Sequence, residues 1–107
     1  MTHPELQQIL TKLRDRLARV FGDELVSLVL FGSQAREEAT VESDIDLLVV
    51  LSRQVDVPKE RSRFSEFLAA LCLEYDVLIT CMWTGIDEWQ TRQSPLMLNI
   101  RREGILV

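Results

Sequence analysis

Two aspartates separated by a single residue, Asp44 and Asp46, stand at the start of a strongly apolar stretch that ends at Leu51. Side chains alternate along a β-strand, so both carboxylates point to the same face of the strand that this stretch predicts. Two like charges this close repel each other, and a hard divalent cation such as Mg²⁺ between them relieves the repulsion. The spacing therefore predicts a metal-binding pair of carboxylates at the mouth of a buried strand.

A Gly-Ser pair, Gly32 and Ser33, follows an earlier apolar segment, residues 25–31. Glycine lets the backbone approach a phosphate closely, and a serine at a turn offers both a backbone N–H and a hydroxyl. Arg36 can add a charge-assisted contact, although an exposed arginine beside acids is also typical of a surface ion pair. Ser43 can contact phosphate or brace the loop through its hydroxyl. We interpret these four residues as candidate nucleotide-binding groups.

The third candidate carboxylate, Asp76, depends on how the strands are arranged. If strand 25–31 runs antiparallel to strand 44–51, the end of the first lies beside the start of the second. We expect a helical crossover to place strand 76–81 parallel to strand 44–51. Asp76 then begins the third strand and lies level with Asp46. Three carboxylates can hold two Mg²⁺ ions about 3.5–4 Å apart, as in-line phosphoryl or nucleotidyl transfer requires. One ion lowers the pKa of the attacking hydroxyl, and the other neutralises the triphosphate and the leaving pyrophosphate.

The remaining periodicity predicts helices between and around these strands. They are expected at residues 6–21, from Pro58 to about residue 72, at 86–92 and from Pro95 to about Gly104, with residues 105–107 as a short closing strand. With one helical turn within residues 34–43, the order begins α-β-α-β-α-β. Strands interleaved with helices predict an α/β or α+β domain with helices packed on a small sheet.

Composition limits the classes of function. The chain has 107 residues, which predicts one domain over residues 1–107, and a formal charge of −5, which argues against a broad basic face for nucleic acid. No apolar run approaches the roughly 20 residues of a membrane span. The first residues lack a signal-peptide pattern, and Cys72 and Cys81 form neither a disulfide framework nor a CxxC motif. We therefore expect a cytoplasmic protein.

Two motifs together resemble a known family. The segment Phe31-Gly32-Ser33-Gln34-Ala35-Arg36, followed by Ser43-Asp44-Ile45-Asp46-Leu47-Leu48-Val49, is similar to the signature of the DNA polymerase β nucleotidyltransferase superfamily. The small size and the ending Arg101-Arg102-Glu103-Gly104 resemble its minimal nucleotidyltransferase branch, called MNT or MntA. The resemblance runs from the first strand to the last residue. Asp76 matches only by its position in the third strand.

This resemblance implies a mixed sheet of three to four strands with flanking helices, and the transfer of AMP from ATP to a hydroxyl with two Mg²⁺ ions. Asp44 and Asp46 would bridge both metals, and Asp76 would bind the catalytic metal. Minimal members are often antitoxins paired with a HEPN-domain ribonuclease toxin, and some add AMP to a tyrosine of that toxin. We therefore expect a HEPN-domain partner. The family often has glycine after the arginine, where this chain has Glu37.

Two alternatives remain open at this stage. The chain could neutralise a partner by occlusion, as a binding module without catalysis, because Glu37 lies close to the expected triphosphate and no second domain is visible. It could instead transfer a nucleotide to a small molecule such as an aminoglycoside, with a homo- or hetero-oligomeric partner supplying the missing wall. We interpret Trp83 and Trp89 as packing residues and His3 as an incidental residue of a frayed terminus.

Overall fold

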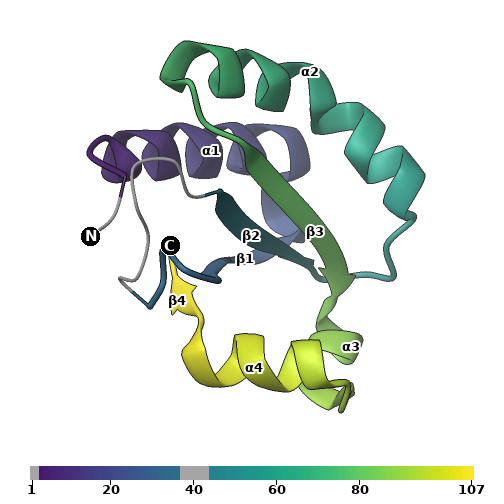
Figure 1. Ribbon diagram of the computed structural model, residues 1–107. Coiled ribbons are helices and arrows are strands. Elements are labelled where there is room, and N and C mark those ends of the chain that lie inside the picture. The colour runs from purple at the N-terminus through teal and green to yellow at the C-terminus, as the bar shows by residue number, and fades with distance from the viewer. Residues whose placement is uncertain (1–2, 37–43) are drawn as a thin grey trace.

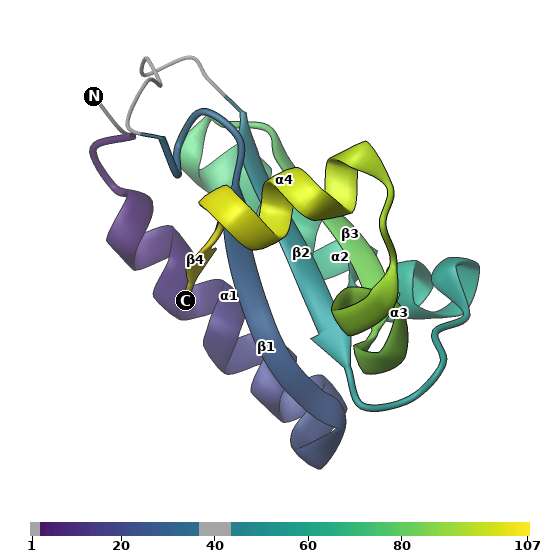
Figure 2. The same cartoon turned by 90° about the horizontal axis from the view of Figure 1, so that it is seen from below.

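The computed structural model describes residues 3–36 and 44–107, and Figures 1 and 2 show two views of it. The expected Ser43 contact and the departure at Glu37 lie outside the described residues. The helices and strands follow the chain in this order: α1 (Leu6–Phe21), the short 3₁₀ helix η1 (Gly22–Glu24), β1 (Leu25–Phe31), β2 (Ile45–Leu51), α2 (Val57–Tyr75), β3 (Ile79–Gly85), α3 (Ile86–Thr91), α4 (Pro95–Glu103) and β4 (Ile105–Leu106).

The strands form one mixed sheet in the order β3-β2-β1-β4. β1 runs antiparallel to both β2 and β4, and β2 runs parallel to β3 through the α2 crossover. Both pairings considered from the sequence are thus confirmed. Helices α1 and α2 cover one face of the sheet, and α3 and α4 lie on the other (Figures 1 and 2).

Each face of the sheet buries its own apolar cluster. Alternate residues of β2, such as Leu47 and Val49, pack with α1 and α2, while Leu48 and Val50 pack with Met97 and Ile100 of α4. Because β2 is covered on both sides, it reads as an almost continuous apolar run, which is why the sequence predicted a buried strand. Trp83 is buried against Phe21 and Phe64, and Trp89 packs against the second cluster, so both tryptophans are packing residues as expected.

Two helices begin at side-chain caps. Asp56 accepts a hydrogen bond from the Lys59 N–H at the start of α2, and Ser94 accepts one from the Met97 N–H at the start of α4. Both helices have proline in the first turn, where a missing N–H costs nothing. In residues 3–36 and 44–107, no helix is both long and apolar enough to cross a membrane.

The expected start of the third strand is wrong. α2 continues to Tyr75, and Asp76 is its C-cap in the left-handed conformation, with φ at 50°. The N–H groups of Asp76 and Val77 both bond to the Cys72 carbonyl, which closes the helix end, and Asp is one of the few residues that enters this conformation readily. The strand begins at Ile79, so Thr80, and not Asp76, lies level with Asp46.

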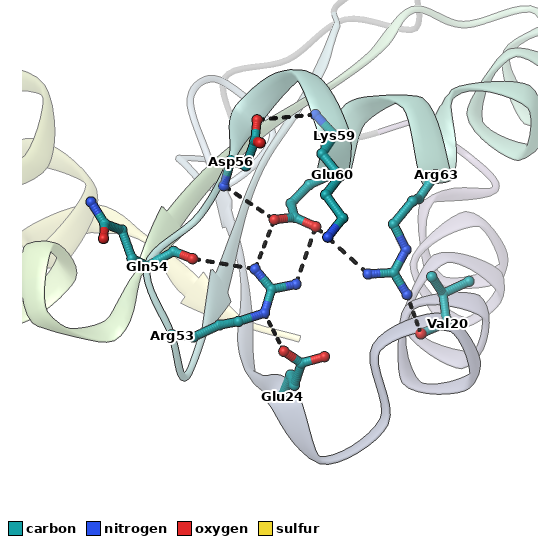
Figure 3. Close-up of polar contacts among 8 residues, drawn as sticks. All are labelled: Val20, Glu24, Arg53, Gln54, Asp56, Lys59, Glu60 and Arg63. Atoms are coloured by element: carbon teal, nitrogen blue, oxygen red, sulfur yellow. Dashed lines mark hydrogen bonds and ion pairs between the residues drawn. The ribbon is translucent and has the colours of Figure 1, made fainter.

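An ion network ties β2 to α2 at the end of β2 that follows Leu51 (Figure 3). Arg53 donates to both carboxylate oxygens of the buried Glu60, at 2.8 and 3.1 Å, and also pairs with Glu24. The Asp56 N–H donates to Glu60, and Arg63 lies 3.6 Å from the same carboxylate. The network therefore supplies donors to a carboxylate that would otherwise be costly to bury.

Candidate active site

Asp46 is the central carboxylate of the site, at the start of β2. It pairs in register with Phe31 of β1 and with Thr80 of β3, and its side chain points to the α4 face by the alternation that buries Leu48 and Val50 there. The Thr80 hydroxyl donates a hydrogen bond of 2.7 Å to Asp46 Oδ1. Residues from β1, β2 and β3 thus meet at one half-buried carboxylate.

Gly32 touches the same carboxylate from the other side. Its φ is +74°, and a Cβ at this position would lie 2.5 Å from Asp46 Oδ2, far inside contact distance. The backbone then turns once, with the Arg36 N–H donating to the Gly32 carbonyl at 3.2 Å, and Ser33 lies half-buried within this turn. The sequence prediction that the Gly-Ser turn and the aspartates meet at one edge of the sheet is therefore confirmed for Gly32 and Asp46.

Asp44 and Asp76 lie beyond the edge of the sheet and are both exposed. Between Asp44 and Asp46, the Ile45 N–H donates to the Leu78 carbonyl at 2.9 Å. This hydrogen bond attaches the start of β2 to the segment that precedes β3. Asp44 and Asp76 line one cavity of about 650 Å³ together with His3 and Tyr75. Asp46 does not line it, so the structure brings Asp76 to Asp44 rather than opposite Asp46.

The donor set matches a hard cation in its chemistry. Within residues 3–36 and 44–107, no three His, Cys, Asp or Glu side chains are grouped closely enough to hold a metal ion by themselves. Asp44 and Asp46 nevertheless supply the carboxylate oxygens that Mg²⁺ prefers, and Mg²⁺ usually takes only one or two carboxylates with waters and substrate phosphates. Two protein carboxylates therefore fit a cation that arrives with a nucleotide.

Arg36 points from the Gly-Ser turn toward the last helix. Its guanidinium lies 3.5 Å from a Glu103 carboxylate oxygen of α4, and both side chains are about two-fifths exposed. Gly32, Arg36 and Glu103 line a cavity of about 230 Å³ between the turn and α4. An anion that enters this cavity would compete with Glu103 for the arginine.

Sequence reasoning missed the support beneath the turn. His3 is 7% exposed and Gln34 1% exposed, and the His3 N–H donates to the Gln34 side-chain oxygen at 3.1 Å. The interpretation of His3 as an incidental residue of a frayed end is therefore wrong, because it lies against the Gly-Ser turn. The sequence holds a weak indication for Gln34, which lies inside the Gly-Ser motif, and none for His3.

Comparison with known proteins identifies the family. The family described as "Nucleotidyltransferase domain" matches residues 8–94, which include the Gly-Ser turn and the paired aspartates. This chain belongs to the nucleotidyltransferase domain family. The family is one of enzymes that act on nucleotides, and the mixed sheet with helices on both faces is its fold.

Three individual proteins show how far the similarity extends. A Methanocaldococcus jannaschii protein named "Putative protein adenylyltransferase" is 37% identical over 75 residues, which span 70% of this chain and 49% of that protein. This chain thus matches about half the length of that relative. A solved structure titled "Structure of putative minimal nucleotidyltransferase" has a TM-score of 0.66 at 23% identity and covers 100% of this chain and 97% of its own. A structure of a tri-AMPylated Shewanella oneidensis HEPN toxin in complex with MNT antitoxin has a TM-score of 0.55 at 19% identity, covering 94% of this chain and 69% of that one.

Proposed function

We propose that this nucleotidyltransferase moves AMP from ATP to a hydroxyl group of a protein partner in a Mg²⁺-dependent reaction. The observation that carries the proposal is the contact between Gly32 and Asp46. It places a turn suited to phosphate directly beside a carboxylate suited to Mg²⁺, with Asp44 two residues earlier. A nucleotide bound there would have its phosphates next to the acids that hold the cation.

Each residue of the site has a defined task in this proposal. Asp44 and Asp46 would hold Mg²⁺, and we propose two ions. When bound, the ions would neutralise charge on the triphosphate and lower the pKa of the acceptor hydroxyl. The Gly32-Ser33 turn would bind the phosphates through its backbone, assisted by Arg36. Asp76 would lie at the margin of the site, in the cavity that it shares with Asp44. Ser43 lies outside the described residues, and we propose that its hydroxyl contacts phosphate or braces the loop.

The transfer itself balances as a displacement at the α-phosphorus. The acceptor oxygen forms a bond to that phosphorus, the bond to the bridging oxygen of the β-phosphate breaks, and pyrophosphate leaves. The hydroxyl proton passes to solvent. Because the reacting groups carry several negative charges, electrostatic stabilisation by the site is the main contribution expected from the protein.

The choice of a protein acceptor draws on two relatives. The M. jannaschii relative is named as a protein adenylyltransferase, and the S. oneidensis structure holds an MNT antitoxin with a HEPN toxin that carries AMP. We propose the same pairing here: a cytoplasmic antitoxin whose partner is a HEPN-domain toxin. The net charge of −5 argues against a nucleic acid held on a broad basic face as the partner.

The test uses ATP labelled at the α-phosphate, Mg²⁺ and the protein that co-purifies with this chain. We expect label on the partner, located by mass spectrometry, and a loss of about 100- to 1000-fold in Asp44→Asn and Asp46→Asn. Asp23→Asn is the matched control, because Asp23 is exposed in η1, at the other end of β1. Undiminished transfer by both site variants would refute the assignment of these aspartates.

One observation favours a second candidate function. The described acids do not form a three-carboxylate group, which would suit a module that neutralises its partner by occlusion alone. The two functions separate in cells that carry both proteins. If Asp46→Asn still silences a toxic partner, occlusion is sufficient, whereas loss of silencing with an intact complex means that catalysis is required.

A further inference from the structure

The position beside Asp46 on the neighbouring strand is occupied by a hydroxyl, not by an acid. We propose that Thr80 is a positioning residue that fixes the Asp46 carboxylate for cation binding. This inference rests on the proposed function, because it assigns the ligand geometry of the same site. From the sequence, the Asp76 carboxylate was expected opposite Asp46, and the strand register places Thr80 there instead.

The register of β2 and β3 decides which residue lies beside Asp46. In the parallel pair of β2 and β3, Asp46 lies opposite Thr80, and paired residues of neighbouring strands point to the same face. The acid that the sequence analysis placed here, Asp76, lies before the strand as the cap of α2. A third ligand that came from the sheet itself would therefore have to come from position 80.

The two oxygens of the Asp46 carboxylate have different neighbours. Thr80 donates its only hydroxyl proton to Oδ1 at 2.7 Å, while Oδ2 faces the backbone of Gly32. The β-branched side chain of threonine has few rotamers, so this donor is held in place before any ligand arrives. A partner that hydrogen-bonds a metal-ligating carboxylate fixes its orientation, and loss of such partners typically lowers metal affinity.

The charge at the site affects how tightly the protein would hold a cation. Beside Asp46 on β3, Thr80 supplies a hydroxyl and no negative charge where a third carboxylate was expected. The cation is then held weakly by the protein alone and more tightly once phosphate oxygens complete its shell. Mn²⁺ affinity should accordingly rise when a non-hydrolysable ATP analogue is present, and it should depend on Thr80 under both conditions.

The experiment measures Mn²⁺ binding by electron paramagnetic resonance, with and without α,β-methylene-ATP. We expect Thr80→Val to weaken Mn²⁺ binding about 10- to 100-fold, and Thr80→Ser, which keeps the hydroxyl, to bind within about threefold of the unchanged chain. Thr84→Val is the matched control. Thr84 lies on the same strand and face, and its hydroxyl bonds to the Gly85 carbonyl instead of a carboxylate.

The outcomes separate this inference from the proposed function. Equal Mn²⁺ affinity of Thr80→Val and the unchanged chain overturns the role of Thr80, even if AMP transfer proceeds. A Thr80→Val defect restored by Thr80→Ser supports it, even if the chain transfers no AMP to the partner tested. If circular dichroism shows that Thr80→Val is unfolded, Thr80→Ala replaces it under the same criteria. No Mn²⁺ binding by the unchanged chain overturns both the cation site and this inference.

Discussion

At Gly32 two separate constraints demand the same residue. The backbone has a positive φ of +74°, and a Cβ would lie 2.5 Å from Asp46 Oδ2. Gly22 shares only the first constraint, because its φ is +56° and a Cβ there would meet nothing within 4 Å. The two glycines therefore separate backbone strain from contact with the site.

Replacing each glycine by alanine should have different consequences. Both Gly32→Ala and Gly22→Ala should lower the free energy of unfolding by about 1 kcal/mol or more, because alanine is strained at positive φ. Only Gly32→Ala should also displace the Asp46 carboxylate, with a loss of Mn²⁺ affinity of about 10- to 100-fold. Urea unfolding and Mn²⁺ titration measure the two effects, and equal Mn²⁺ affinity in both variants would contradict the proposed contact.

The Cys81 thiol should be chemically silent in the folded protein. Burial raises its pKa to about 12, so the thiolate that attacks thiol reagents such as aromatic disulfides is scarce at pH 8. In a Cys72→Ser background, we expect Cys81 to react with Ellman's reagent at least about 100-fold more slowly in buffer than in guanidinium chloride. Similar rates in the two solutions would show that the α2–β3 side of the sheet opens readily.

At the scale of elements, α4 contacts the Gly-Ser turn through the ion pair of Arg36 with Glu103. Glu103→Gln removes a negative charge that competes with phosphate for the arginine. We expect the KM for ATP to fall by up to about fivefold, the size of a partly exposed ion pair. Steady-state kinetics test this, with Glu88→Gln as the control because Glu88 pairs with Arg92 away from the turn. An unchanged or higher KM would mean that Arg36 does not bind the nucleotide.

The strands and one of their pairings were predictable, whereas the exact start of one strand was not. Apolar runs indicated the strands, and the length of the crossover indicated that β3 is parallel to β2. The antiparallel pairing of β1 with β2 was a supposition, and the structure confirms it. The end of α2 escaped prediction because Tyr75-Asp76-Val77 continues an acceptable helix pattern into an acceptable strand pattern. Only the left-handed turn at Asp76, closed by the Cys72 carbonyl, decides between them.

That one boundary changes the composition of the site. The contact of Gly32 with Asp46 follows from the antiparallel pairing of β1 with β2, and the sequence spacing alone does not determine it. The neighbour of Asp46 on β3 depends on the register, and a shift of the strand start from residue 76 to residue 79 replaces a carboxylate by the Thr80 hydroxyl. The contact of His3 with Gln34 joins residues 31 positions apart and left no pattern in the sequence.

Across the whole molecule, β2 separates two polar centres with different tasks. The candidate active site lies at the start of the strand, and the Arg53–Glu60 network lies beyond its end, where it joins η1 and α2 to the segment after β2 (Figure 3). Glu60 is fully buried, while the predicted ligand Asp44 is exposed. Changes to Glu60 should therefore alter stability with little direct effect on the chemistry of the site.

Stability should depend on acid through Glu60 in a defined pH range. The Arg53 guanidinium holds the pKa of the Glu60 carboxyl at about 2, below the ordinary 4.5. A lowered folded-state pKa gives a stabilising contribution that is complete above about pH 4.5 and is lost as the pH falls toward about 2. At pH 7 we expect Glu60→Gln to lower the free energy of unfolding by about 1.5–3 kcal/mol, the range for a hydrogen bond to a charged group.

Urea unfolding at a series of pH values tests this dependence. The difference in stability between the unchanged chain and Glu60→Gln should be constant from pH 7 to about pH 5. It should then shrink as the pH falls toward 2, because a protonated Glu60 is uncharged, as glutamine is at every pH. Glu88→Gln is the matched control, since Glu88 forms only an exposed pair with Arg92. A difference that stays constant down to pH 2 would show that packing around Glu60, and not its charge, stabilises the junction of β2 and α2.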